Sequence, residues 1–220
     1  MATKETAIEL PKLNLETMQI TLVGDTPLIV HAWSEKAKKE MLDKQMKKAK
    51  PAKEAKDPEA DFQASLYKMD GGGYGFPSVG FKAAAVTACT SVGGITKVAA
   101  RQAFRVVGEL TQTTAAFNSI KMRNDLVRIQ GGNPEMREDM VRVGMGTADI
   151  RYRAQFWPWH VNVKVVFNAN VLSAEQIVNL FNTAGFGVGI GEWRSEKDGQ
   201  YGSFHVATAD EMRKLIKSAA

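Results

Sequence analysis

Glycines alternate with other residues in a short C-terminal segment that also holds cations and aromatic rings. The segment from Gly185 to Gly202 has the sequence GFGVGIGEWRSEKDGQYG. Because glycine has no side chain, a phosphate backbone could approach its main-chain N–H groups closely, with cationic side chains beside them. The candidate binding residues of this glycine loop are Gly187, Gly189, Gly191, Trp193, Arg194, Lys197, Gly199 and Tyr201. The alternative is a glycine-rich bulged connection that only packs tightly.

The position of the glycine loop disfavours a nucleotide cofactor. A mononucleotide loop needs a strand, the pattern GxxxxGK[ST] and a helix, and a dinucleotide loop needs GxGxxG at the start of a helix. Here the glycines follow a predicted helix and lead into a predicted strand. We therefore expect no cofactor.

Two segments upstream of this loop alternate as half-buried strands do. Apolar residues occupy every second position of 150–156 and of 161–167, and the two segments meet across Trp157 and Pro158. Arg151, Arg153 and Lys164 fall on the opposite, polar side of these strands. Three cations on neighbouring strands could contact phosphates, since each neutralised phosphate releases counterions.

Single-stranded nucleic acid also needs planar groups on which bases can stack. Trp157, Trp159, Trp193 and Tyr201 could supply them. For Trp157 and Trp159, packing in the core or at a subunit interface is the alternative.

Catalytic chemistry has little support in the sequence. The histidines are His31, His160 and His205, and no HExxH, GxSxG or Cys/His cluster with metal spacing occurs. We therefore expect no metal and no catalysis. The alternative is a metal-independent endoribonuclease in which His31, just after the first strand, acts as general base.

The elements that would position these residues follow from periodicity and capping signals. We expect a strand at 17–23, helices from Ser34, Ser78 and Thr96 (the last to about Gly108), a charged loop at 47–61, a small hairpin at 65–76, a helix from Ser173 to Gly185, a strand at 202–207 and a helix from Thr208. Without insertions the order is βαββαβ. This order predicts an α+β, ferredoxin-like (RRM-like) fold, an antiparallel sheet with helices on one face. The polar face of that sheet would present Gln19, Thr21, Asn162 and the three cations.

The order of three motifs resembles the RAMP superfamily, which includes the CRISPR-associated backbone subunits. The motifs are the turn Thr26-Pro27-Leu28, the segment FPSVGFKAAA from Phe76 to Ala85, and the glycine loop before the last strand. The chain departs from the family at Gly80 and Ala83, where small polar residues and glycine are usual. The short length and the lysine-rich insertion favour a stand-alone, phage-encoded relative.

The resemblance implies binding of single-stranded RNA by subunits that polymerise head-to-tail along the strand. Lys82 matches the family's helix lysine that faces the nucleic-acid backbone, and Gly187, Gly189, Gly191 and Gly199 match its glycine loop. The chain would be one RAMP-like domain, 1–220, with a lysine-rich helical insertion and hairpin at 31–73. By position, 109–149 would be a thumb-like excursion.

Composition agrees with a single core and an anionic partner. Of 220 residues 44% are hydrophobic, and 29 Lys and Arg against 24 Asp and Glu give a net charge of +5. Cys89 is the single cysteine, and no apolar stretch approaches the roughly 18 residues of a membrane span. We predict a non-catalytic, head-to-tail oligomeric protein of the bacterial cytoplasm that binds single-stranded RNA or DNA. A structural assembly protein of a virion remains another alternative.

Overall fold

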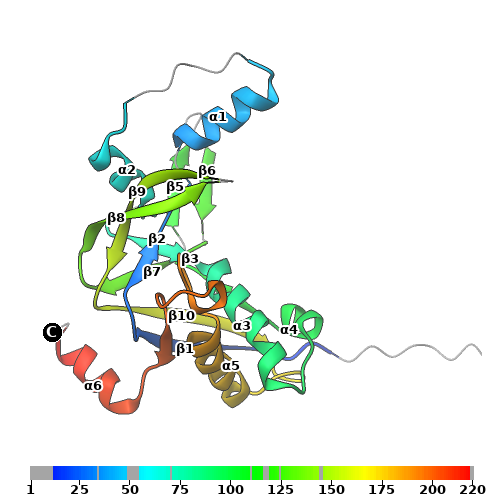
Figure 1. Cartoon of the computed structure of the whole chain (residues 1–220). Helices are drawn as coiled ribbons and strands as arrows, with labels where there is room; N and C mark the ends of the chain where they lie inside the picture. Colours follow the sequence, from blue (N-terminus) through cyan, green and yellow to red (C-terminus); the bar gives the residue numbers. More distant parts are fainter. Residues whose placement is uncertain are drawn as a thin grey trace, which may run out of the picture.

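The protein is an α+β chain with antiparallel sheets (Figure 1). The computed structural model describes residues 12–33, 35–48, 55–69, 71–109, 111–115, 119–123, 125–143 and 146–218. Within them lie a six-stranded central sheet, a three-stranded second sheet and a two-stranded hairpin.

The central sheet joins strands from the whole length of the chain. It contains β1 (Leu15–Gly24), β3 (Gly75–Pro77), β4 (Phe104–Val107), β7 (Leu126–Gly131), β10 (Trp159–Asn168) and β11 (Phe204–Val206). The order is β11-β1-β10-β7-β3, and β4 pairs with a further part of β10. β1 and β10 form the long central pair, in register from Leu15 opposite Asn168 to Val23 opposite His160.

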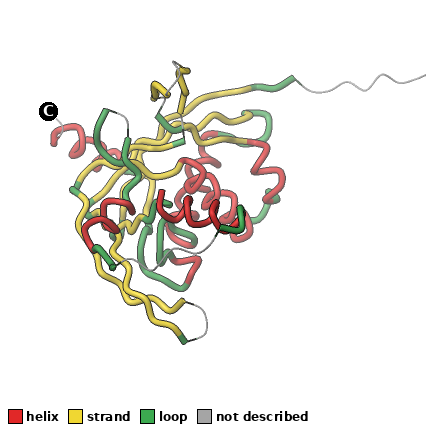
Figure 2. The backbone as a smooth tube through the Cα atoms, turned by 90° about the horizontal axis from the view of Figure 1, so that it is seen from above, coloured by secondary structure: helices red, strands yellow, loops and turns green. Residues whose placement is uncertain are grey.

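Helices cover one face of this sheet (Figures 1 and 2). They are α3 (Ser78–Val92), α4 (Lys97–Ala103) and α5 (Ala174–Gly187). Alternating apolar residues of the strands, such as Leu22 and Val163, are fully buried against ring side chains such as Phe81 and Phe181. The predicted start of α5 is confirmed, because Ser173 and Gln176 form a capping box. The predicted end at Gly185 is wrong, since the helix continues to Gly187.

The second sheet contains β2 (Leu28–Val30), β8 (Pro134–Val143) and β9 (Thr147–Phe156), in the order β2-β9-β8. The short helix α2 (Pro58–Ser65) packs on β9, where the Ser65 hydroxyl accepts a hydrogen bond from the Ala154 N–H at 2.9 Å. The expectation that 150–156 belongs to the same sheet as 161–167 is wrong. Beside β10 lie β4 and β7 instead, so the segment 109–149 contributes β7 to the central sheet.

The remaining elements lie outside these two sheets. They are α1 (Glu35–Gln45), the hairpin of β5 (Thr111–Ala115) and β6 (Ser119–Arg123), the one-turn helix η1 (Ser195–Lys197) and α6 (Ala209–Ser218). The predicted loop 47–61 ends in α2, and the hairpin expected at 65–76 is reduced to a single bridge between Lys68 and Tyr74 beside β3. Within the described ranges, no helix has both the length and the apolar character that crossing a bilayer requires.

His205 ties α6 to the edge of the central sheet. Its Nδ1 lies 2.7 Å from Asp25 Oδ1 and its Nε2 lies 3.0 Å from Glu211 Oε1. Burial lowers the pKa of His205, but hydrogen bonds to the two carboxylates outweigh it, so the pKa is raised. Hydrogen bonds from Thr208 and His205 lower the pKa of Glu211 to about 2. The predicted Thr208–Glu211 cap of α6 is confirmed, with the Glu211 carboxylate accepting from the Thr208 N–H.

Candidate nucleic-acid interface

The face of the central sheet opposite the helices is open. Strand alternation places one polar set on it, because residues paired across antiparallel strands share a face. On β1, β10 and β4 this face presents Leu15, Thr17, Gln19, Thr21, Val23, His160, Asn162, Lys164, Val166, Asn168, Arg105 and Val107. The Thr21 hydroxyl donates to Asn162 Oδ1 at 2.7 Å, which links the two central strands.

The open face is basic. Lys164 pairs with Gln19 on one side and with Val107 on the other, and Arg105 is opposite Val166, the next position of β10 on this face. Both cations are exposed. Diagonal neighbours of this kind have Cα atoms about 7–8 Å apart. On this face the three described strands carry no carboxylate, so the positive charge is not neutralised by their own residues.

Arg105 was missed by the sequence prediction. The segment from Thr96 was expected to stay helical to about Gly108, but α4 ends at Ala103 and β4 follows at once. The sequence does contain the alternation of a strand here, because the buried residues Phe104 and Val106 alternate with Arg105. A four-residue alternation is too short to be distinguished from a helix end by periodicity.

The expectation that Arg151 and Arg153 lie beside Lys164 on the open face is wrong. Both lie on β9 in the second sheet. Arg153 is 1% exposed, its Nη2 lies 3.4 Å from Asp139 Oδ2, and its Nη1 donates to Glu192 Oε2 at 3.2 Å. Burial lowers the pKa of Arg153, against the raising effect of the two carboxylates. Arg151 is 38% exposed, with its Nε 4.0 Å from Asp149 Oδ2.

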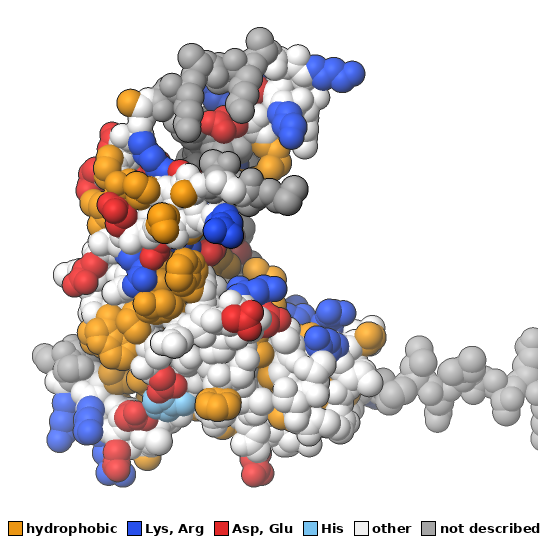
Figure 3. Space-filling view, viewed as in Figure 1, with side chains coloured by type: hydrophobic (Ala, Val, Ile, Leu, Met, Phe, Trp, Pro, Cys, Tyr) orange, Lys and Arg blue, Asp and Glu red, His pale blue; other side chains and the backbone are white. Residues whose placement is uncertain are grey.

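A cluster of guanidinium groups, carboxylates and aromatic rings joins β8 and β9 to the glycine loop. We call it the aromatic–guanidinium cluster; it contains Arg137, Asp139, Arg153, Glu192, Trp193 and Tyr201. Arg137 Nε donates to Asp139 Oδ1 at 2.8 Å, and Arg137 Cζ lies 4.7 Å from the Tyr201 ring centroid. Arg153 Cζ lies 5.9 Å from the Trp193 ring centroid. Figure 3 shows hydrophobic side chains gathered over the sheet that contains β8 and β9.

The sequence prediction missed Arg137, Asp139 and Glu192 as members of this cluster. In the β8–β9 pair, Asp139 is opposite Arg151 and Arg137 is opposite Arg153. The sequence does not give this strand register, which places Arg137 and Asp139 beside Arg153. Glu192 reaches the cluster because its own N–H donates to the Ile29 carbonyl of β2 at 3.0 Å. That bond connects segments far apart in the chain, and no local pattern predicts it.

The glycines of the loop allow the chain to fold tightly on itself. The N–H groups of residues 188–190, 192, 196–199, 201 and 202 all donate to backbone carbonyls of the protein. A Cβ atom at Gly191 would overlap the Ile29 carbonyl, and one at Gly199 would overlap the Trp193 carbonyl. Gly189 has a φ of +70°, while Gly187 has open space around it. These contacts favour the tightly packed connection over a cradle of free N–H groups.

The other predicted cations are dispersed. Arg194 donates to Glu196 Oε2 from Nη2 at 2.8 Å and from Nε at 3.1 Å, which neutralises it. Lys197 is exposed on η1. Lys82 lies on α3, on the helix side of the sheet, and its Nζ donates to the Arg101 carbonyl at 3.0 Å. The structure therefore brings together Arg153, Trp193 and Tyr201 but places Lys82 and Lys164 on opposite faces of the central sheet.

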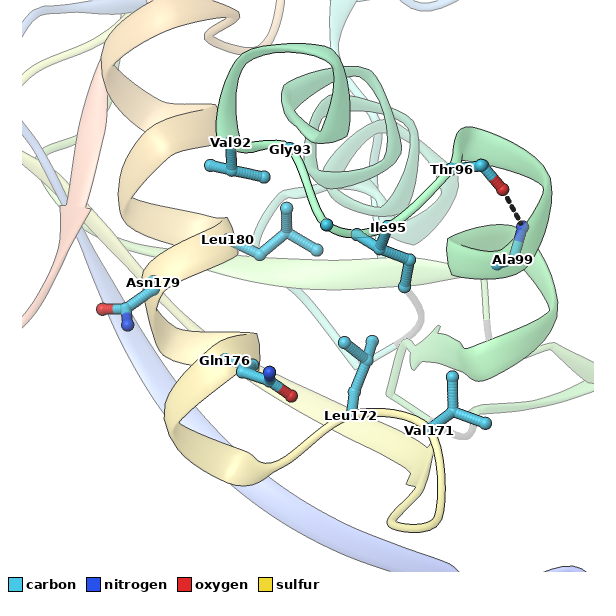
Figure 4. Close-up of a pocket in the computed structure, with 11 residues that line it drawn as sticks. Val92, Gly93, Ile95, Thr96, Ala99, Val171, Leu172, Gln176, Asn179 and Leu180 are labelled. Carbon is cyan, nitrogen blue, oxygen red and sulfur yellow. Dashed lines mark hydrogen bonds between the residues drawn. The ribbon is translucent and has the colours of Figure 1, made fainter.

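In the described part of the chain, no three His, Cys, Asp or Glu residues are arranged to hold a metal ion. Desolvation lowers the pKa of His31, with Glu192 acting in the opposite direction. A cavity of about 500 Å³ lies where the α3–α4 connection meets the start of α5 (Figure 4). Its walls include Val92, Ile95, Leu172 and Leu180, and none of its lining residues is charged or a histidine, so it offers no cation to a phosphate and no acid or base for proton transfer.

Comparison of the chain with models of known protein families and with curated proteins finds no match.

Proposed function

We propose that the protein binds single-stranded nucleic acid without cleaving it, and that phosphate groups contact the open face of the central sheet. The observation that carries the proposal is the diagonal placement of two exposed cations, Arg105 and Lys164, on a face where β1, β10 and β4 carry no carboxylate. Such a face attracts a polyanion and releases its counterions. Gln19 and Asn162 add hydrogen-bonding groups between the cations.

The strand order supports this proposal. Taken in chain order, β1, α3, β4 with β7, β10, α5 and β11 follow the sequence strand, helix, strand, strand, helix, strand. The fourth strand lies beside the first, and the third lies between the first and the second. We propose that these elements form the ferredoxin-like core of a RAMP-like protein, a fold whose open sheet face is used by RNA-recognition domains. Head-to-tail assembly along the strand belongs to the same proposal.

Fluorescence anisotropy with labelled single-stranded DNA and RNA at several salt concentrations tests the proposal. Arg105→Gln and Lys164→Gln should each weaken binding and each reduce the slope of log K against log salt by about 1. Arg101→Gln is the matched control, because Arg101 is an exposed cation on α4 in the helix layer. Equal losses in all three variants, or no salt-dependent binding by the unmodified protein, would reject this interface.

A further inference from the structure

Trp193 combines an exposed ring with an unfavourable backbone. The residue is 41% exposed, and its φ of 55° lies in the left-handed region. A bulky residue with positive φ is an outlier, and such conformations cluster at functional sites where the surrounding structure imposes them. A tryptophan held in this way calls for an explanation beyond folding.

The glycine loop imposes the conformation of Trp193 from both sides. Before it, the Glu192 N–H donates to the Ile29 carbonyl at 3.0 Å, and after it the Trp193 carbonyl accepts from the Tyr201 N–H at 3.1 Å. Gly199 lies so close to the Trp193 carbonyl that no side chain could be placed there. The ring therefore projects from a backbone that is fixed at several points, which lowers the entropy that a ligand must remove.

Arg153 packs against the Trp193 ring. Its guanidinium lies over the ring at 5.9 Å, and the arginine itself is buried between Asp139 and Glu192. The Trp193 ring is therefore partly exposed while it also contacts a buried guanidinium. The Arg137 guanidinium likewise lies over the Tyr201 ring. The Tyr201 N–H donates a hydrogen bond to the Trp193 carbonyl.

Charge in this region favours a neutral, planar ligand over an anion. Arg153 and Arg137 are matched within the cluster by Asp139 and Glu192, and nearby Arg194 is paired with Glu196. On the open sheet face, in contrast, β1, β10 and β4 carry Arg105 and Lys164 and no carboxylate. A phosphate would gain little at the cluster, whereas the π-face of a base would gain stacking on a fixed ring.

We propose that Trp193 is a stacking site for one unpaired nucleobase of the bound strand. This inference rests on the proposed function and adds to it a base contact separate from the phosphate contacts. Because stacking does not depend on hydrogen bonds to a base edge, the site would accept any base.

The test compares a thymidine oligonucleotide with an abasic oligonucleotide of equal length and equal phosphate number. Trp193→Gly removes the ring and leaves a residue for which positive φ carries no strain. It should weaken binding of the thymidine strand about 5- to 150-fold and leave binding of the abasic strand unchanged. Trp193→Phe keeps an aromatic face and should retain most of the affinity. Trp33→Ala is the matched control, because Trp33 is 56% exposed outside the loop.

Quenching of tryptophan fluorescence by the thymidine strand gives a second measurement, which does not depend on whether the glycine variant folds. Quenching should be present in the unmodified protein and largely absent in Trp193→Phe. If Trp193→Gly and Trp193→Phe both behave as the unmodified protein on both strands, the stacking site is wrong while the phosphate interface stands. If the unmodified protein binds neither strand, the proposed function itself is wrong, and the stacking site with it.

Discussion

Replacing Asp139 with asparagine is expected to destabilise the protein more than replacing Arg153 with methionine, although Arg153 is the more deeply buried residue. Asp139 is 6% exposed and lies between two guanidinium groups. Its Oδ1 accepts from Arg137 Nε at 2.8 Å, and its Oδ2 lies 3.4 Å from Arg153 Nη2. Removing the carboxylate charge leaves two buried or half-buried cations facing each other.

The magnitudes follow from what each variant leaves behind. Breaking a buried ion pair by removing one partner costs about 3–5 kcal/mol, and we expect Asp139→Asn to reduce the free energy of unfolding by about 3 kcal/mol. Arg153→Met leaves Asp139 hydrogen-bonded to Arg137, and the methionine replaces the buried aliphatic stem, so its cost should be about 1–2 kcal/mol. Glu192→Gln should cost less than about 1 kcal/mol, because the Glu192 side chain is 42% exposed.

Urea unfolding followed by far-ultraviolet circular dichroism would measure the free energy of unfolding of the three variants. The dependence of that free energy on urea concentration, m, would be fixed at the value of the unmodified protein. The double variant Asp139→Asn, Arg153→Met completes a cycle and should show a coupling of about 1 kcal/mol or more. A larger loss for Arg153→Met than for Asp139→Asn would refute the reasoning, since it would make Arg153 the residue on which the cluster depends.

Two further perturbations test the glycine loop and the C-terminal helix. Gly199→Ala should destabilise the protein by about 2 kcal/mol or more, because its Cβ would overlap the Trp193 carbonyl, whereas Gly187→Ala has open space and should change thermal stability little. His205→Gln should reduce stability by about 0.5–1 kcal/mol near pH 6, because the pKa of His205 is raised in the folded state. The stability contributed by His205 is complete below its ordinary pKa of 6.5 and is lost as the pH rises through its raised pKa. The stability contributed by Glu211 is complete above its ordinary pKa of 4.5 and is lost as the pH falls towards its lowered pKa of about 2. The difference between the two proteins should therefore shrink in alkaline buffer, and a constant difference in unfolding free energy from pH 6 to pH 9 would contradict this assignment.

Local sequence patterns predicted about half of the elements, because the causes of those elements are local. The alternation at 17–23 and 161–167 became β1 and β10, and the caps at Ser173 and Thr208 begin α5 and α6. A capping box or a period of two depends only on residues within one turn or one strand. The same patterns failed near Phe104, where four residues were too few to show that the helix had ended.

Which strand pairs with which was not contained in any local pattern. The alternation of 150–156 was correct, but its partners are β2 and β8, and the exposed side expected for Arg153 is covered by the glycine loop. Periodicity separates the two faces of a strand without saying what will lie over each face.

The glycine loop shows the same difference between what a local sequence pattern predicts and what tertiary contacts decide. The sequence alone placed the glycine-rich residues 185–202 between a helix and the last strand, and it favoured a phosphate-binding loop over a tightly packed connection. Only the tertiary structure decided what that segment does, because the hydrogen bond from Glu192 to Ile29 of β2 and the contacts of Glu192 and Trp193 with Arg153 of β9 fix it against the second sheet. Its N–H groups donate to backbone carbonyls, and Trp193 stays partly exposed. The bond between Ile29 and Glu192 joins segments more than 100 positions apart in the chain, and its energy exists only once the sheets have assembled.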